Sequence, residues 1–246
     1  MAAEAFDDGE ALVGYAQASP GNHGFVIDAI VAPFDGSDDA RADLLAAVIA
    51  ALPADAAITW WTQEGDRAGR LAARLALGAG RALLQMRRPL PLDVTTDVSV
   101  RSFAVGADEA AWLEVNNAAF AWHGEQGGWD LATLQQREHA PWFRADGFLL
   151  HEIDGRLAAF CWTKLHPPAG GGPVVGEIYV IAVHPDFHGR GLGKALTVAG
   201  LAWLHTAGAT EGMLYVDADN SSAVALYRAL GFQITRTDQA YIRPTA

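Results

Sequence analysis

Apolar and polar positions alternate along the chain with two different periods, which mark strands and helices. Residues 177–183 (EIYVIAV) form an almost unbroken apolar run, which is typical of a buried strand. Residues 192–206 (LGKALTVAGLAWLHT) place apolar side chains every three to four positions, which predicts an amphipathic helix. The dipeptide Asp154-Gly155 separates two further apolar runs and predicts a tight β-hairpin.

The second half of the chain predicts a complete α/β (α+β) domain in the order βααβββαβαββ, with a mixed central sheet flanked by helices. The strands are expected at residues 98–103, 147–153, 156–165, 177–183, 212–218, 232–237 and 240–243. The helices are expected at residues 108–120, 130–140, 192–206 and 221–230.

An internal repeat relates the two halves. Residues 24–45 resemble residues 176–197 at one constant offset, and residues 73–80 match residues 226–233 after a one-residue gap. We therefore expect two related domains, at residues 1–90 and 97–246. Residues 86–97, rich in proline and polar side chains, suit a linker. The first copy begins only at its third strand, near residues 10–18, so we expect it to be truncated.

Composition and charge narrow the classes of partner. The 246 residues carry a formal net charge of -12, which disfavours nucleic acid or an anionic membrane as a partner. The acidic N-terminal segment lacks the pattern of a signal peptide, and no apolar run is long enough to cross a bilayer. The single cysteine, Cys161, is expected to be buried, and no Cys/His spacing indicates a metal. We expect a cytoplasmic monomer that binds a small molecule.

A glycine-rich turn follows the buried strand directly, in residues 183–196 (VHPDFHGRGLGKAL). A Walker A loop would need Ser or Thr after Lys194, but Ala195 stands there. A dinucleotide fingerprint would need a third glycine where Lys194 stands. The remaining interpretation is a pyrophosphate held by backbone N–H groups at a helix start. A solvated basic turn is the alternative.

At these residues the chain resembles the GNAT acetyltransferases, whose acyl-CoA loop reads Gln/Arg-x-x-Gly-x-Gly/Ala, with His188 replacing the first residue here. Residues 218–232 (ADNSSAVALYRALGF) resemble a later helix of that fold. The resemblance implies a tandem GNAT fold that uses acetyl-CoA as co-substrate and no metal. The residues that it implies for acetyl-CoA are Ile181, Ala182, Val183, His188, Gly189, Arg190, Gly191, Leu192, Gly193, Lys194, Asn220, Ser221, Ser222, Ala223, Val224 and Ala225.

Further segments resemble the mycothiol synthase family, tandem GNAT enzymes of actinobacteria. They include residues 125–129 (EQGGW), 162–164 (WTK) and 176–180 (GEIYV). The resemblance covers residues 86–241 well and residues 14–88 loosely. It implies acetyl transfer to the cysteinyl amine of cysteinyl-glucosaminyl-inositol, the last step of mycothiol biosynthesis. The residues that it implies for the acceptor are Glu125, Lys164, Glu177 and Tyr215.

An amine acceptor is mostly protonated near neutral pH, so acetyl transfer needs a general base. The resemblance places the base at Glu177 and the general acid at Tyr227. Each residue also has a structural alternative. Glu177 could be a surface charge at a strand end, and Tyr227 could be a core residue of an amphipathic helix.

The repeat alignment shows what the first copy has lost. Phe25 stands opposite Glu177, and Arg74 stands opposite Tyr227. Asp39 and Arg41 replace the glycines of the loop, so a carboxylate would face the phosphate and Cβ atoms would block backbone approach. We therefore predict that the first copy neither catalyses nor binds CoA well by this loop.

Three functions compete at this stage. The first is the mycothiol-forming acetyltransferase, favoured by residues 125–129 and by Lys164. The second is a GNAT enzyme with another amine acceptor, such as a peptide N-terminus or an aminoglycoside. The third is an acetyl-CoA sensor without activity, which the presence of both Glu177 and Tyr227 disfavours.

Overall fold

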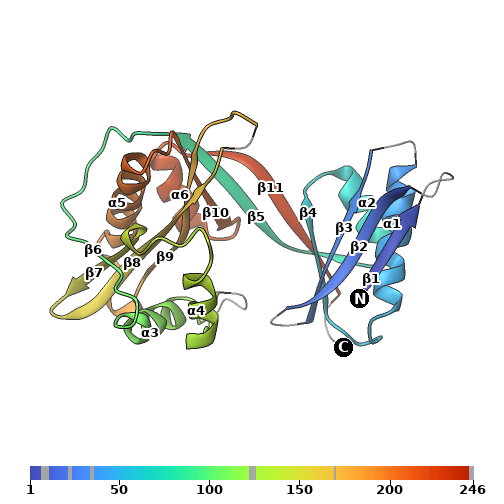
Figure 1. Cartoon of the computed structure of the whole chain (residues 1–246), viewed down its shortest axis with the longest axis horizontal. Helices are drawn as coiled ribbons and strands as arrows, with labels where there is room; N and C mark the ends of the chain where they lie inside the picture. Colours follow the sequence, from blue (N-terminus) through green and yellow to red (C-terminus); the bar gives the residue numbers. More distant parts are fainter. Residues whose placement is uncertain (7–10, 22–23, 34–35, 122–125, 169, 244–246) are drawn as a thin grey trace. The chain divides into compact units, whose positions relative to one another are not determined.

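The computed structural model describes residues 1–6, 11–21, 24–33, 36–121, 126–168 and 170–243. The chain forms two compact units (Figure 1). Unit 1 comprises Met1–Leu84, Asp217–Asp219 and the C-terminal stretch from Arg236, and unit 2 comprises Gln85–Val216 and Asn220–Thr235. Within the described ranges, no helix is both long and apolar enough to cross a membrane.

Unit 1 is a sheet with two helices, α1 (Ser37–Ala50) and α2 (Asp66–Arg74). Its strands follow the order β1-β2-β3-β4-β11. They are β1 (Ala2–Phe6), β2 (Leu12–Gly21), β3 (Gly24–Val31), β4 (Ile58–Gln63) and β11 (Gln233–Arg243). Its core includes Ile27, Leu45 and Trp60, each 2% exposed or less. Strand β1, antiparallel to β2, was not among the expected elements.

Unit 2 carries the larger set of elements. Its strands follow the order β5-β10-β9-β8-β7-β6. They are β5 (Gly78–Pro89), β6 (Arg101–Ser102), β7 (Phe148–Ile153), β8 (Arg156–His166), β9 (Val175–Val183) and β10 (Glu211–Asp217). Its helices are α3 (Glu109–Ala119), α4 (Leu131–Glu138), α5 (Leu192–Thr206) and α6 (Ser221–Ala229), with short 3₁₀ turns at Ala145–Gly147 and Pro185–Phe187.

The sheet of unit 2 is covered by helices on both faces, α5 on one and α3 on the other (Figure 1). Helix α5 lies very close to the strands, because a Cβ added at Gly200 would come within 2.5 Å of the Cys161 sulfur. Cys161 is buried, as expected, and burial raises the pKa of its thiol. On the α3 side an aromatic core includes Trp112, Phe148 and Trp162, each fully buried.

The last strands of the two copies are exchanged. After α2 the chain enters β5, which neighbours β10, whereas β11 follows α6 and pairs antiparallel with β4. Each strand therefore completes the sheet of the other copy, and the C-terminal strand belongs to unit 1. The division of residues between the units thus differs at the C-terminus from the expected ranges of 1–90 and 97–246.

Several expected boundaries were wrong. Residues 232–237 and 240–243 were expected as two strands, but a single long strand, β11, runs from Gln233 to Arg243. The expected linker at residues 86–97 begins inside β5, which ends only at Pro89. The expected strand at residues 98–103 is reduced to the two residues of β6. The expected order from β7 to α6 is confirmed.

Candidate functional site

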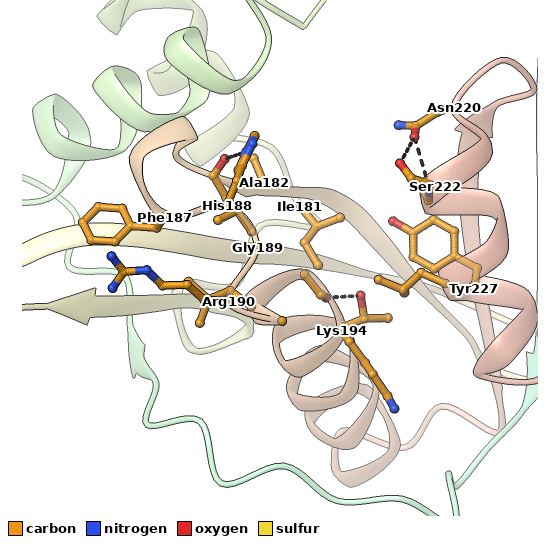
Figure 2. Close-up of a pocket in the computed structure, with 17 residues that line it drawn as sticks. Ile181, Ala182, Phe187, His188, Gly189, Arg190, Lys194, Asn220, Ser222 and Tyr227 are labelled. Atoms are coloured by element: carbon orange, nitrogen blue, oxygen red, sulfur yellow. Dashed lines mark hydrogen bonds between the residues drawn. The ribbon is translucent and has the colours of Figure 1, made fainter.

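A cavity of about 380 Å³ opens in unit 2 between the glycine-rich loop, strand β9 and helix α6 (Figure 2). Eleven of the residues that line it come from the segment 181–194, and five come from residues 220–227 around the start of α6. The cavity therefore joins the two segments that resembled the GNAT pattern.

Strand β9 forms one wall because it parts from β10. The parallel pairing of β9 with β10 runs from Val175 opposite Glu211 to Ile178 opposite Leu214 and ends there, in a stretch that the structure describes fully. At that point the pairing with β8 shifts by one residue, which leaves Tyr179 as a bulge. A bulge bends a strand and reverses its facing pattern. Residues 181–183 stay paired with residues 159–161 of β8 but have no partner on β10, and they line the cavity.

The glycine-rich loop forms the second wall. Gly189 and Gly191 have φ values of 75° and 73°, and Gly191 is the N-cap of α5. A Cβ at either position would meet no atom within 4 Å, so the space beside the loop is open. The first turn of α5 has no acidic residue, and its free N–H groups and dipole favour an anion.

Basic side chains surround this helix start. Arg190 packs over the ring of Phe187 at 5.2 Å, and Lys194 leaves the first turn of α5 in a different direction (Figure 2). The His188 ring nitrogen Nε2 lies 2.9 Å from the carbonyl oxygen of Val183, which ties the loop back to the end of β9. The loop thus offers both backbone donors and positive charge.

Helix α6 forms the third wall. Asn220 caps it, since its side-chain oxygen accepts hydrogen bonds from the Ala223 N–H at 3.1 Å and the Ser222 hydroxyl at 3.0 Å. Tyr227, two turns further on, lines the cavity and is only 8% exposed (Figure 2). Burial raises the pKa of Tyr227, so its hydroxyl keeps its proton at neutral pH.

Glu177 lies on β9 before the bulge and does not line the cavity. It is 7% exposed, and its carboxylate oxygen Oε2 lies 2.7 Å from the His166 nitrogen Nε2 on β8. Lys164 is directly opposite Glu177 in the antiparallel register. The Lys164 ammonium packs over the rings of Trp142 at 4.7 Å and Tyr179 at 5.5 Å. Glu177 therefore lies in a basic and aromatic environment on one face of the sheet.

The structure brings most of the expected acetyl-CoA residues together. The cavity is lined by every one of them except Ser221, Val224 and Ala225, which lie on α6 without lining it. Tyr215 is on β10, 39% exposed, and its hydroxyl accepts a hydrogen bond from Gln85 at 2.7 Å. Glu125 lies outside the described residues.

Sequence reasoning missed four residues of this region. Phe187, Thr197 and Leu226 also line the cavity, and His166 contacts Glu177. Thr197 could have been named from the sequence, because it lies one helical turn after Gly193 of the glycine-rich loop. Its hydroxyl donates a hydrogen bond to the Gly193 carbonyl oxygen at 2.7 Å. Within the described part of the chain, no group of three or more His, Cys, Asp or Glu side chains could hold a metal ion.

The corresponding region of unit 1 is arranged differently. Helix α1 begins with Asp38 and Asp39 in its first turn, where α5 has no acidic residue. Arg74 of α2, the counterpart of Tyr227, donates to Asp39 at 2.6 Å, and Arg67 pairs with Asp38. Carboxylates thus occupy the helix start that offers free donors in unit 2.

The chain matches a protein family and individual proteins of known name. Residues 111–232 match the acetyltransferase (GNAT) family. The chain is 41% identical to a mycothiol acetyltransferase from Kocuria rhizophila over 95% of this chain and 82% of that protein. It is 40% identical to a mycothiol acetyltransferase from Rhodococcus jostii over 96% of this chain and 81% of that protein.

Solved structures agree on the fold. A GCN5-related N-acetyltransferase from Sphaerobacter thermophilus superposes with a TM-score of 0.73 at 19% identity, covering 98% of this chain and 80% of its own. A tandem GNAT protein from the clavulanic acid biosynthesis pathway superposes with a TM-score of 0.70 at 15% identity, covering 98% and 81%. The expected tandem GNAT fold is therefore confirmed.

Proposed function

The chain belongs to the mycothiol acetyltransferase family of GNAT enzymes, and we propose that it transfers the acetyl group of acetyl-CoA to the cysteinyl amine of cysteinyl-glucosaminyl-inositol, giving mycothiol. The observation that carries this proposal is the arrangement on β9. A buried carboxylate precedes the bulge, and a cavity with a protonated tyrosine follows it.

Acetyl-CoA supplies the acetyl group as a thioester, and the cavity of unit 2 fits its anionic arm. The open, positive-φ glycines leave room for a pyrophosphate beside the N–H groups of α5. Arg190 and Lys194 neutralise its charge. N–H groups within residues 181–183 that point to the side without a β10 partner bind the pantetheine arm and polarise the carbonyl group to be attacked.

Glu177 acts as the general base. A glutamate side chain is ionised at neutral pH in water, and it accepts the proton that the acceptor's ammonium must lose. His166 donates its Nε2 proton to Oε2 of Glu177, which leaves Oε1 to face the amine. The proton moves from the amine to Glu177, directly or through water, as the amine nitrogen attacks the carbonyl carbon.

Tyr227 acts as the general acid. Its buried hydroxyl remains protonated, so it can donate to the sulfur atom that leaves when the carbon–sulfur bond breaks. Lys164 and Tyr215, together with Glu125, hold the sugar and inositol hydroxyls of the acceptor. We assign catalysis to the copy at residues 97–246 and a non-catalytic role to the degenerate copy at residues 1–90, whose Asp39–Arg74 pair replaces the catalytic arrangement.

Replacing His166 tests how Glu177 is held. A hydrogen bond to a charged group is worth about 1.5–3 kcal/mol, so His166→Leu should lower kcat about 10- to 100-fold with little change in the KM for acetyl-CoA. His166→Gln keeps an N–H donor and should recover most of the loss. Steady-state kinetics with both substrates varied measures the two constants. Equal losses of kcat in His166→Leu and His166→Gln would exclude the idea that an N–H donor at this position holds Glu177.

Placing a carboxylate in the glycine-rich loop tests the pyrophosphate site. Gly191→Asp copies the counterpart residue Asp39, and Asp tolerates the left-handed backbone. Repulsion of about 1–4 kcal/mol from a nearby phosphate should raise the KM for acetyl-CoA by between about 5-fold and about 900-fold. Gly155→Asp is the matched control, with φ 75° and open space at the β7–β8 turn. An equal rise of the KM for acetyl-CoA in Gly191→Asp and Gly155→Asp would argue against a pyrophosphate site at this loop.

An acceptor panel tests the proposed reaction. The protein is mixed with acetyl-CoA and one of three acceptors: cysteinyl-glucosaminyl-inositol, a peptide with a free N-terminus, or an aminoglycoside. Release of CoA is followed by a method that corrects for the acceptor's own thiol. We expect turnover with the cysteinyl pseudodisaccharide to exceed that with the other two. Preference for the peptide or the aminoglycoside would favour the alternative, a GNAT enzyme with another amine acceptor.

We further propose that the enzyme works in the cytoplasm, where acetyl-CoA is available, as a monomer.

A further inference from the structure

A chain of hydrogen bonds joins residues of unit 2 that lie on three neighbouring strands, β11, β5 and β10. Gln85 on β5 donates from Nε2 to the Tyr215 hydroxyl on β10 at 2.7 Å. The Gln85 oxygen Oε1 accepts from Arg87 Nε at 3.0 Å and from the Thr235 hydroxyl on β11 at 3.2 Å. Arg87 continues the chain by donating to Glu211 at 2.8 Å. Gln85 is only 8% exposed, so its amide is a buried polar group whose bonding is satisfied.

This network determines the direction of the Tyr215 hydroxyl. Arg87 Nε can only donate, so a flipped Gln85 amide would set two donors against each other; Oε1 therefore faces Arg87, and Nε2 faces Tyr215. The Tyr215 oxygen therefore acts as an acceptor inside the network, which leaves its O–H to point away from Gln85. Since Tyr215 is 39% exposed, that proton is available to a molecule outside.

A groove of about 440 Å³ lies beside this network, lined by Gln85, Arg87, Arg88, Pro89, Glu211, Gln233 and Thr235. It opens on the same face of the sheet as Glu177. Met213 is paired with Glu177, so Glu211 and Tyr215, two positions on either side of Met213, share that face. Helix α5 covers the opposite face, where a Cβ at Gly212 would lie 2.8 Å from Leu201.

The charges in the groove suit a neutral ligand. Arg87 is already paired with Glu211, and an incoming anion would meet that carboxylate. Arg88 directs its guanidinium to the backbone oxygens of Leu230 and Pro89. What remains is a mixture of donors and acceptors from amide, hydroxyl, guanidinium and carboxylate groups. Such a mixture matches the hydroxyls of a polyol, each of which both donates and accepts.

We propose that this groove is the subsite for the polyol end of the acceptor, with Gln85 as the positioning residue that makes Tyr215 a hydrogen-bond donor. Tyr215 donates to one ring hydroxyl, and Glu211 accepts from another. The subsite rests on the proposed function and deepens it, because it gives the enzyme a preference for a cysteinyl amine that carries inositol over one that lacks it.

An isosteric replacement isolates the direction of the hydrogen bond. Gln85→Glu keeps the size of the side chain and the acceptor for Arg87, but a carboxylate cannot donate, so the Tyr215 proton turns inward. The readout is the ratio of kcat/KM for cysteinyl-glucosaminyl-inositol to kcat/KM for cysteinyl-glucosamine. We expect Gln85→Glu and Tyr215→Phe each to lower this ratio about tenfold, and the double variant to lower it no further than either one.

Gln239→Leu is the matched control, since that amide on β11 bonds only to backbone oxygens in the interactions described, at 2.9 and 3.1 Å for Gly80 and Arg81. The ratio of the kcat/KM values for the two acceptors should stay at the wild-type value in this variant. A Gln85→Glu variant that keeps the ratio while Tyr215→Phe loses it would overturn the positioning role. Equal kcat/KM for the two acceptors in the wild type would overturn the subsite, whereas no turnover with either acceptor would refute the proposed function itself.

Discussion

Replacing Glu177 with glutamine is expected to lower kcat about 10²- to 10⁴-fold, the range typical of a lost general base. The amide keeps the shape of the side chain and its contact with His166, but it cannot take a proton from the acceptor's ammonium. Binding of acetyl-CoA should be little affected, because Glu177 does not line the cavity in which we place the cofactor. Pre-steady-state and steady-state rates at saturating concentrations of both substrates measure the change.

Glu152→Gln serves as the control for Glu177. Glu152 is a strand carboxylate on β7 that pairs with Arg101, and it does not line the cavity. Its replacement should leave kcat within about twofold of the wild type, since exposed ion pairs contribute little. If Glu177→Gln kept the wild-type kcat, a group other than Glu177 would have to take the proton from the acceptor's ammonium.

Removing the hydroxyl of Tyr227 is expected to lower kcat about 10²-fold or more, because the departing thiolate loses its proton donor. Tyr227→Phe preserves the ring, which packs edge-on against Phe232 at 5.9 Å, so the fold and the KM for acetyl-CoA should change little. Burial raises the pKa of Tyr227 above its ordinary value of about 10. The wild-type kcat should therefore not fall through loss of this proton as the pH rises to about 9.

Tyr241→Phe is the matched control for Tyr227. Both tyrosines are 8% exposed, but Tyr241 lies in the core of unit 1 and not in the cavity. Circular dichroism and thermal unfolding would show whether both variants fold alike. If Tyr241→Phe lowered kcat as far as Tyr227→Phe, the effect would be one of stability, and the acid role would be lost.

The sequence predicted the part of the site that depends on local pattern. A glycine loop after a strand and before a helix predicted an anion site, and the resemblance to the GNAT pattern then supplied its residues. Asn220 at a helix start and Tyr227 two turns later were likewise readable, because helical spacing places both on one stripe. These residues line one cavity.

Features that depend on register and on distant pairing could not be read in this way. The contact between His166 and Glu177 joins the neighbouring strands β8 and β9, and the bulge at Tyr179 shifts their pairing by one residue. The exchange of β5 and β11 between the copies follows from tertiary packing and leaves no local signal. The same holds for Gln85, a polar residue of a long strand whose role appears only when Tyr215 and Thr235 are placed beside it.

The most direct test of the central claim is the chemical position of the transferred acetyl group. The protein is incubated with acetyl-CoA and cysteinyl-glucosaminyl-inositol, and the product is analysed by mass spectrometry before and after hydroxylamine, which cleaves thioesters but not amides. We predict one acetyl group that resists hydroxylamine, formed by the wild type and nearly absent with Glu177→Gln. An acetyl group that hydroxylamine removes, or equal amide product from both proteins, would contradict the account.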